Sequence, residues 1–249
     1  MAVTDSASES ESESPVRGPG GDPFRAIVPY VVPMFGYLTL TTLEGYLPTA
    51  AGGAPSPLWY PAAYALKVAV VAGLMVAYRS TWRDLAPWPG VRNLALSMAL
   101  GLAVTVVWVG LDGYYPKFGI SGSRAEFNPN VLSRGARWAF VAVRLLGLVV
   151  LVPVFEELFW RSFLIRWLVA DSDDFTRVPI GRVTPLAAAI TSVLFALVHP
   201  EWLPALLTGL AWAWLVWHTR SLTACVVSHA TANLALGLYV LATGAWKFW

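Results

Sequence analysis

Long apolar runs, separated by short polar or turn-rich stretches, dominate the chain after its first two dozen residues. They cover residues 26–47, 58–78, 93–111, 138–169, 184–199, 203–217 and 222–242. Most are close to the roughly 20 residues that an α-helix needs to cross a bilayer. Lipid accepts only helices or closed barrels, and the runs lack the alternating pattern of barrel strands. The pattern therefore predicts an all-α fold, a polytopic transmembrane bundle of seven or eight helices.

The start of the chain has a different composition. Residues 1–23, MAVTDSASESESESPVRGPGGDP, are dominated by Ser, Glu, Pro and Gly and contain no apolar run. Such a segment cannot bury enough surface to fold, so we expect a disordered N-terminal tail. It also lacks the basic region and apolar core of a signal peptide. Residues 24–249 are expected to form a single membrane domain, because the length leaves no room for a separate soluble one.

The run at 138–169 is too long for one simple crossing. As an unbroken helix, its 32 residues would extend for about 48 Å, against a hydrocarbon core of about 30 Å. Pro153 removes a backbone donor in its middle, which predicts a kink at that point. A hairpin there would instead invert the topology of everything that follows.

Composition and charge agree with a membrane protein. Hydrophobic residues make up 57% of the chain and charged residues only 13%, whereas soluble domains usually carry about 25% charged residues. The net charge of +2 is small and the basic residues are scattered, so we expect the lipid bilayer and not nucleic acid as a partner. The one cysteine, Cys225, leaves no intramolecular disulfide or cysteine-based metal site to be built.

Basic residues between the runs indicate an orientation. A cytoplasmic N-terminus places most of them, including Arg79, Arg83 and Arg92, on the inner side of the membrane. This agrees with the positive-inside rule. We therefore expect a multi-pass protein of the cell membrane with its N-terminus in the cytoplasm.

Ionisable side chains inside the apolar runs are costly, so each needs a partner or a function. Glu44, Lys67 and Arg144 are single residues, for which snorkelling or a structural ion pair is a sufficient explanation.

The segment VPVFEELFWR is different, because it places two carboxylates and a guanidinium within six residues. Glu157 and Arg161 are four residues apart and share a helix face, which favours an ion pair. Glu156 points about 100° away from Glu157. One carboxylate is thus fixed by Arg161, while the other remains available for chemistry.

Two further segments add polar groups. His199 ends an apolar run just before Pro200, with Phe195 one turn earlier on the same face. His229 and Asn233 are four residues apart and therefore project from one face of the last helix. Together with Glu156, they supply a general base, its orienting partner and two oxyanion donors, which are the groups that water needs to attack an amide.

In this order, these residues resemble the three motifs of the CAAX-protease and bacteriocin-processing family, membrane peptidases related to the type II CAAX prenyl endopeptidase. The motif EExxxR falls on Glu156, Glu157 and Arg161, FxxxH on Phe195 and His199, and HxxxN on His229 and Asn233. The resemblance covers roughly residues 137–242, the expected catalytic core. The segments VPVFEELFWRSFLIRW and RSLTACVVSHATANLALGLYVLATGAWKFW look like the bacterial branch of this family, which is found alongside exosortase sorting systems.

The resemblance implies an intramembrane endopeptidase that cleaves a membrane-tethered peptide or protein tail. Glu156 and His199 would activate water, and His229 and Asn233 would stabilise the oxyanion. The supporting residues would be Glu157, Arg161 and Phe195.

The resemblance leaves the catalytic type open, because the family has been described both as metal-dependent and as a glutamate peptidase. A zinc ion, if present, would be held by Glu156, His199 and His229. The compact HExxH pair is absent, which favours a metal-free site.

Two other classes of protein fit the polar cluster. In a non-catalytic binding, immunity or scaffold protein, the same residues would hold the helices together. In a transporter they would line a cargo site, but that class predicts internal repeats, and the two halves of this chain show no convincing similarity.

Overall fold

The computed structural model describes residues 23–50, 53–116, 126–172 and 174–249. The tail that we expected to be disordered lies outside the described residues, apart from Pro23, where the first helix begins. The α-helices are α1 (Pro23–Glu44), α2 (Trp59–Ala77), α3 (Gly90–Gly110), α4 (Arg134–Leu146), α5 (Val152–Glu157), α6 (Ile165–Val169), α7 (Pro185–Leu197), α8 (Trp202–Thr219) and α9 (Leu222–Thr243). The described part of the chain contains no β-strand, so the all-α prediction is confirmed.

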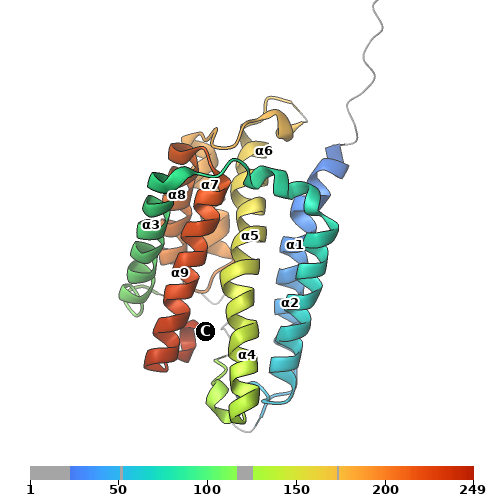
Figure 1. The fold of residues 1–249 in the computed structure, drawn as a ribbon, viewed down its shortest axis with the longest axis vertical. Helices are drawn as coiled ribbons and strands as arrows, with labels where there is room; N and C mark the ends of the chain where they lie inside the picture. The colour runs from blue at the N-terminus through green and yellow to red at the C-terminus, as the bar shows by residue number, and fades with distance from the viewer. Residues whose placement is uncertain (1–22, 51–52, 117–125, 173) are drawn as a thin grey trace, which may run out of the picture.

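The helices run up and down in one bundle (Figure 1). The column α4–α5–α6 stands between the pair α1 and α2 on one side and α3, α8 and α9 on the other. A 3₁₀ segment, η2 (Arg79–Leu85), runs along one end and connects α2 to α3. The first helix begins at this same end, whereas the C-terminus lies toward the opposite end.

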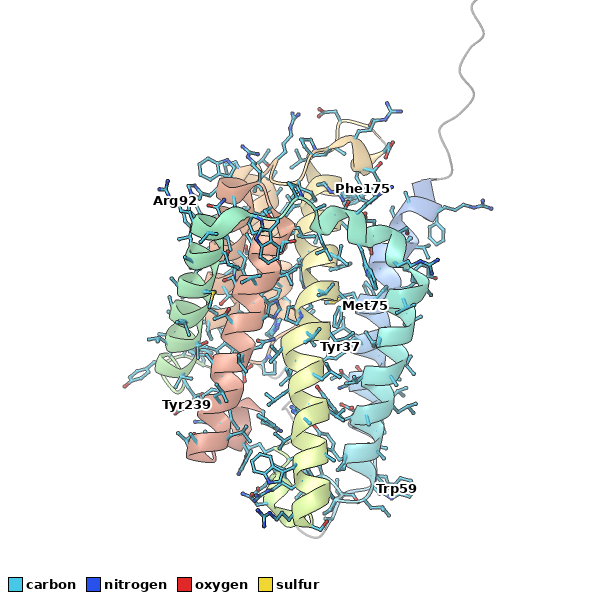
Figure 2. All side chains as sticks on the ribbon, in the orientation of Figure 1. Tyr37, Trp59, Met75, Arg92, Phe175 and Tyr239 are labelled. Atoms are coloured by element: carbon cyan, nitrogen blue, oxygen red, sulfur yellow. The ribbon has the colours of Figure 1, made fainter. Side chains whose placement is uncertain are left out.

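Among the described residues, five helices are long and apolar enough to cross a membrane, namely α1, α2, α3, the continuous helix Arg134–Val169 and α9. The long helix contains α4, α5 and α6. Counted as one helix, it brings the α-helices of the described residues to seven, within the predicted number. Figure 2 labels Arg92 and Phe175 near one end of the bundle and Trp59 near the other, with Tyr37 and Met75 between them.

Helix α7 is the short member of the bundle. Thr184 caps its start by accepting a hydrogen bond from the amide of Ala187, and Pro185 occupies the first turn, where no backbone donor is needed. The helix ends after 13 residues, a length of about 20 Å. Pro200 follows directly and disfavours continuation. His199 therefore lies in the turn between α7 and α8, after a helix too short to cross a hydrocarbon core of about 30 Å.

Helix Arg134–Val169 does not fold back on itself at Pro153. Its interruption is instead a π-helical stretch, Gly147–Leu151, directly before α5, and a second one, Leu158–Leu164, directly after it. A π-helical turn places one extra residue in the ring of each hydrogen bond and is frequent at functional sites. The hairpin alternative is therefore wrong, and the direction of the chain is not inverted at Pro153.

Small residues allow the helices around α9 and α8 to approach closely. A Cβ atom at Gly101 in α3 would lie 2.3 Å from the carbonyl oxygen of Ser228 in α9. A Cβ atom at Gly209 in α8 would lie 2.9 Å from the backbone of Ser192 in α7. Such contacts are typical of membrane bundles, where packing and hydrogen bonds drive association in the absence of a hydrophobic force. The approach at Gly101 fixes the position of α9, which carries His229.

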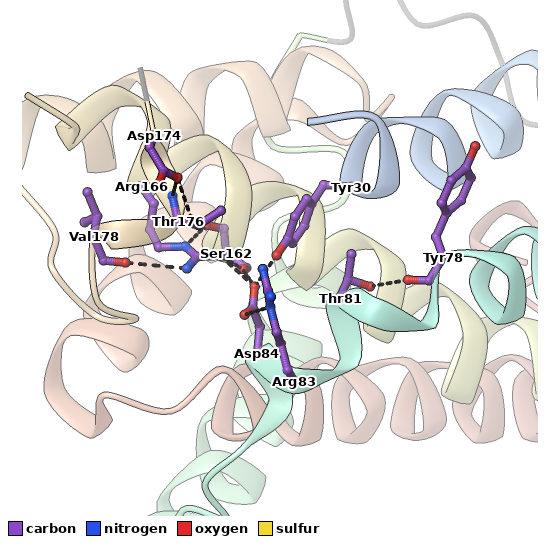
Figure 3. A network of polar contacts seen from close by, with 10 residues as sticks. All are labelled: Tyr30, Tyr78, Thr81, Arg83, Asp84, Ser162, Arg166, Asp174, Thr176 and Val178. Atoms are coloured by element: carbon purple, nitrogen blue, oxygen red, sulfur yellow. Dashed lines mark hydrogen bonds and ion pairs between the residues drawn. The ribbon is translucent and has the colours of Figure 1, made fainter. Parts of the chain in front are cut away.

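A buried polar network fastens η2 to the bundle (Figure 3). One carboxylate oxygen of Asp84, Oδ2, accepts hydrogen bonds from Tyr30 of α1 at 2.6 Å, from Ser162 at 2.5 Å and from Arg166 of α6 at 2.6 Å. Both charged partners are more than nine-tenths buried. The network joins three segments that are far apart in the sequence and holds the upper part of the long helix in place.

Candidate active site

A cavity of about 720 Å³ opens between the helices, and four polar residues line it: Glu156, His199, His229 and Asn233. They come from α5, from the turn between α7 and α8, and from α9. The volume lies within the range of about 300 to 1,000 Å³ that is usual for ligand sites. The four residues proposed from the sequence as catalytic are thus brought to one space, although they are spread over 78 positions of the chain.

Glu157 points away from this cavity into a fully buried cluster. Its side chain is 0% exposed, and its Oε1 lies 3.2 Å from Nη1 of Arg161. The same oxygen lies 3.0 Å from Nδ1 of His229. The predicted ion pair with Arg161 is therefore present, and the sequence did not show that Glu157 would also hold His229.

Aromatic rings enclose the Arg161 and His229 side chains of this cluster. The guanidinium of Arg161 lies over the rings of Phe195 and Trp212, at 4.9 and 5.0 Å from their centroids. The imidazole of His229 stacks on Trp212 with ring centroids 4.3 Å apart. Cation–π contacts of this kind stabilise a guanidinium in the absence of water. Glu157 and Trp212 together fix the plane of the His229 ring.

The contacts of His229 determine which atom faces the cavity. Its Nδ1 is taken up by Glu157, so Nε2 is the nitrogen left for a ligand. A carboxylate accepts hydrogen bonds, which places a proton on Nδ1 when Glu157 is ionised. Nε2 then donates a hydrogen bond only when the ring carries its second proton. The carboxylate of Glu157 is well placed to stabilise that imidazolium.

His199 is oriented by its own helix. Its Nδ1 lies 2.7 Å from the carbonyl oxygen of Phe195, one turn earlier, and the two rings are 4.4 Å apart. A carbonyl only accepts, so Nδ1 carries a proton and, in the neutral ring, Nε2 is the nitrogen with the lone pair. Trp108 of α3 contacts the ring edge-on, with centroids 5.8 Å apart. This tautomer suits a residue that accepts a hydrogen bond from water.

Asn233 is tied to the π-helical stretch before Pro153. Its Nδ2 donates to the carbonyl oxygen of Leu148 at 2.7 Å. In this stretch the amide of Val152 bonds to the carbonyl of Gly147, five residues back. The corresponding donor for Leu148 would be residue 153, a proline without an N–H. Asn233 therefore satisfies a carbonyl that the backbone cannot, and its amide has a second N–H for another acceptor.

The start of α8, just after His199, packs against the loop that follows α3. Tyr115, in the loop after α3, packs edge-on against Trp202, with ring centroids 5.8 Å apart. Burial and, second to it, the nearby carboxylate of Glu201 raise the pKa of Tyr115 to about 12. Trp202 also donates from its indole nitrogen to the carbonyl of Pro116 at 2.8 Å. These contacts fix the turn that carries His199.

A metal site does not emerge from the same residues. Within the described ranges, no group of three His, Cys, Asp or Glu side chains is arranged to hold a metal ion. Zinc would need its ligand atoms at about 2 Å, and Glu156, His199 and His229 are not gathered in that way.

Several residues of the site carried no signal in the sequence. Leu148 takes part through its backbone carbonyl, and Trp212 is one of many tryptophans in apolar runs. For Arg144, the sequence suggested no more than a structural role, but its side chain lines the same cavity as Glu156. The pair of Glu44 and Lys67 does form the structural ion pair that was expected, at 2.6 Å.

Comparison with known proteins supports the assignment of this region. The family model "Type II CAAX prenyl endopeptidase Rce1-like" matches residues 138–235. The matched range contains Glu156, Glu157, Arg161, Phe195, His199, His229 and Asn233, and the resemblance seen in the sequence is thereby confirmed. Searches of curated proteins and of solved structures give no significant match to the chain. The match suggests a multi-pass membrane protease of the CAAX type.

Proposed function

We propose that the chain is an intramembrane endopeptidase that hydrolyses a peptide bond in a membrane-tethered peptide or protein tail. The observation that carries the proposal is the convergence of Glu156, His199, His229 and Asn233 on one cavity. Desolvated polar groups cost several kcal/mol each, on the order of 2.5 or more at membrane depth. Four of them around one space are expensive unless they serve a ligand or a reaction.

The reaction assigns the two sides of the cavity different tasks. Glu156 accepts a proton from a water molecule that His199 helps to orient, and the water oxygen attacks the scissile carbonyl carbon. The C–N bond then breaks, and Glu156 returns the proton to the leaving amine. Each proton and electron pair is thereby accounted for without another reactant.

His229 and Asn233 face the oxygen of the scissile carbonyl in this proposal. Negative charge develops there as water attacks, and preorganised donors stabilise it best where bulk water is excluded. Protonated Nε2 of His229 and the second N–H of Asn233 are the donors. The carboxylate of Glu157 supports the charge on His229 from behind and thus acts as a positioning residue.

The orientation that we propose has the N-terminus in the cytoplasm. The start of α1, segment η2 and the turn between α8 and α9 lie at one end of the bundle (Figure 1). Arg79, Arg83 and Arg220 belong to these segments, and the positive-inside rule places such an end in the cytoplasm. The C-terminus then lies on the outer side.

The direct test compares cells that produce the protein with cells that produce Glu156→Gln. Mass spectrometry of membrane and secreted fractions should show new chain ends in membrane-attached proteins only in cells with the unmodified protein. The variant must be present at the same level, which detergent extraction and quantification establish. Identical sets of chain ends in the two strains would contradict proteolysis and favour a non-catalytic scaffold.

A further inference from the structure

The cavity has a second polar end that no motif covers. Besides the four residues of the proposed reaction, Arg144, Lys67, Glu44, Tyr60 and Tyr64 line it. They belong to α1, α2 and α4, and all but Arg144 lie outside the range that the family model matches. The chemistry of this end therefore has to be derived from its own contacts.

Arg144 is a buried cation without a carboxylate partner. Its side chain is 6% exposed, and no carboxylate of the described residues lies within ion-pair distance of it. Nη1 donates to the hydroxyl of Tyr60 at 2.9 Å, while Nε is buried with no hydrogen-bond acceptor. The guanidinium lies over the rings of Tyr64 and Trp249, at 4.7 and 5.5 Å. Rings and one hydroxyl orient it but do not neutralise it.

The neighbouring charges do not compensate Arg144 either. Lys67 donates to Glu44 at 2.6 Å and to Thr41 at 3.1 Å, and it lies over the ring of Tyr37. Lys67 and Glu44 thus form a neutral pair. Among the residues that the structure describes, one positive charge, that of Arg144, remains at this end of the cavity. A buried guanidinium of this kind is costly unless an anion joins it, and its planar fork suits a carboxylate.

The distance between the two ends indicates which carboxylate fits. Arg144 and Glu156 are twelve residues apart on one continuous helix, a separation of about 18 Å along its axis. An extended peptide advances about 3.3 Å per residue, so about five residues would bridge the two sites. A carboxylate that belongs to the substrate peptide would neutralise Arg144 and would also lie the right distance from a peptide bond at Glu156.

We infer that Arg144 binds the α-carboxylate at the C-terminus of the peptide tail and thereby places the bond about five residues upstream at Glu156. The inference rests on the proposed function and adds to it a substrate class and a cleavage position. Arg144 then acts as a specificity residue that reads the free end of the chain. Tyr60 orients it, and Trp249 covers its outer face.

The test uses peptides with an N-terminal palmitoyl anchor and a randomised ten-residue tail, each made as the free acid and as the C-terminal amide. The purified protein in phosphatidylcholine vesicles should cleave the acids about five residues from the end. It should prefer them to the amides by about 10- to 100-fold in kcat/KM, as expected for a desolvated charge pair. Arg144→Gln should abolish the preference, and Arg144→Lys should partly retain it.

Two controls separate this role from a structural one. Arg134→Gln removes a charge from an exposed position of the same helix and should leave the acid-to-amide ratio unchanged. Tyr60→Phe removes only the hydroxyl that orients Arg144 and should lower the ratio part of the way, which keeps the test informative if Arg144→Gln fails to fold. Melting temperatures of all variants show whether a change reflects unfolding.

Binding of the same peptides to Glu156→Gln separates the inference from the proposed function. A preference for acids in binding, with no cleavage by the unmodified protein, would reject the peptidase and keep the anion site. Cleavage with equal rates for acids and amides would keep the peptidase and overturn the role of Arg144. Loss of tightly bound phospholipid from Arg144→Gln, with the acid preference intact, would assign the guanidinium to a lipid phosphate and also overturn the inference.

Discussion

The same substitution, Glu to Gln, should affect different properties of the protein at the two neighbouring glutamates. Glu156→Gln and Glu157→Gln each replace a buried carboxylate with an amide of the same size. Glu157 holds Arg161 and His229, whereas Glu156 lines the cavity. We therefore expect Glu157→Gln to reduce stability and Glu156→Gln to abolish turnover while leaving the fold intact.

The size of the stability loss follows from the environment of Arg161. Removing one partner of a buried pair typically costs about 3 to 5 kcal/mol, because the remaining charge is left uncompensated. The rings of Phe195 and Trp212 stay in contact with the guanidinium and retain about 1 to 2 kcal/mol of stabilisation. A loss near the lower limit, about 3 kcal/mol, is expected. For a chain of this length it corresponds to a fall in melting temperature of about 6 to 12 °C.

Thermal unfolding in detergent measures this loss, with Glu156→Gln as the matched control. The double variant Glu157→Gln/Arg161→Met removes both charges and should recover most of the lost stability, as a double-mutant cycle requires. Equal melting temperatures for the two single variants would refute the division of roles. So would a double variant no more stable than Glu157→Gln, because the loss would then not come from an unpaired Arg161.

Three further predictions concern the surroundings of the site. Asn233→Ala should lower turnover about 100- to 1,000-fold and reduce stability by about 1 kcal/mol. The added substitution Pro153→Ala supplies a backbone N–H for the carbonyl of Leu148. It should restore stability, measured by thermal unfolding, but not turnover. Gly101→Ala forces a Cβ atom against the backbone of α9 and should cost about 1 to 3 kcal/mol, whereas Gly73→Ala meets open space and should be neutral or stabilising in the same measurement. Asp84→Asn leaves a buried Arg166 without its counter-charge and should cost about 3 kcal/mol, and an unchanged melting temperature would contradict this account of the network.

Most of the secondary structure could be predicted, because an apolar segment that lies in lipid must form a helix to satisfy its backbone hydrogen bonds. The run at 58–78 became Trp59–Ala77, and the run at 222–242 became Leu222–Thr243. Helix ends differ from the predicted runs by a few residues, since capping groups such as Thr184 and Ser221 determine where a helix begins. Hydrophobicity alone does not report those groups.

The sequence singled out the residues that line the candidate site, but it did not predict how they are arranged. A simple reading of the runs places His199 at the outer end of a full crossing, far from Glu156. The structure resolves this, because α7 has only 13 residues and ends at the depth of the cavity. The link between Glu157 and His229 joins segments 72 positions apart. No local pattern encodes such a contact, which depends on how α5 and α9 pack.

The π-helical stretch at Gly147–Leu151 explains how one helix serves both ends of the cavity. Twelve residues of regular α-helix turn by about 100° each, which would leave Arg144 and Glu156 on faces about 120° apart. A hydrogen bond to the fifth residue back widens the turn to about 4.4 residues, or about 82° per residue, so the five π-helical residues remove about 90° of rotation. The two side chains then lie on nearly the same face, and both line the cavity. Asn233 stabilises this conformation through the carbonyl of Leu148, which Pro153 leaves without a backbone donor. The contact that fixes a proposed oxyanion donor is thus also the contact that aligns Arg144 with Glu156.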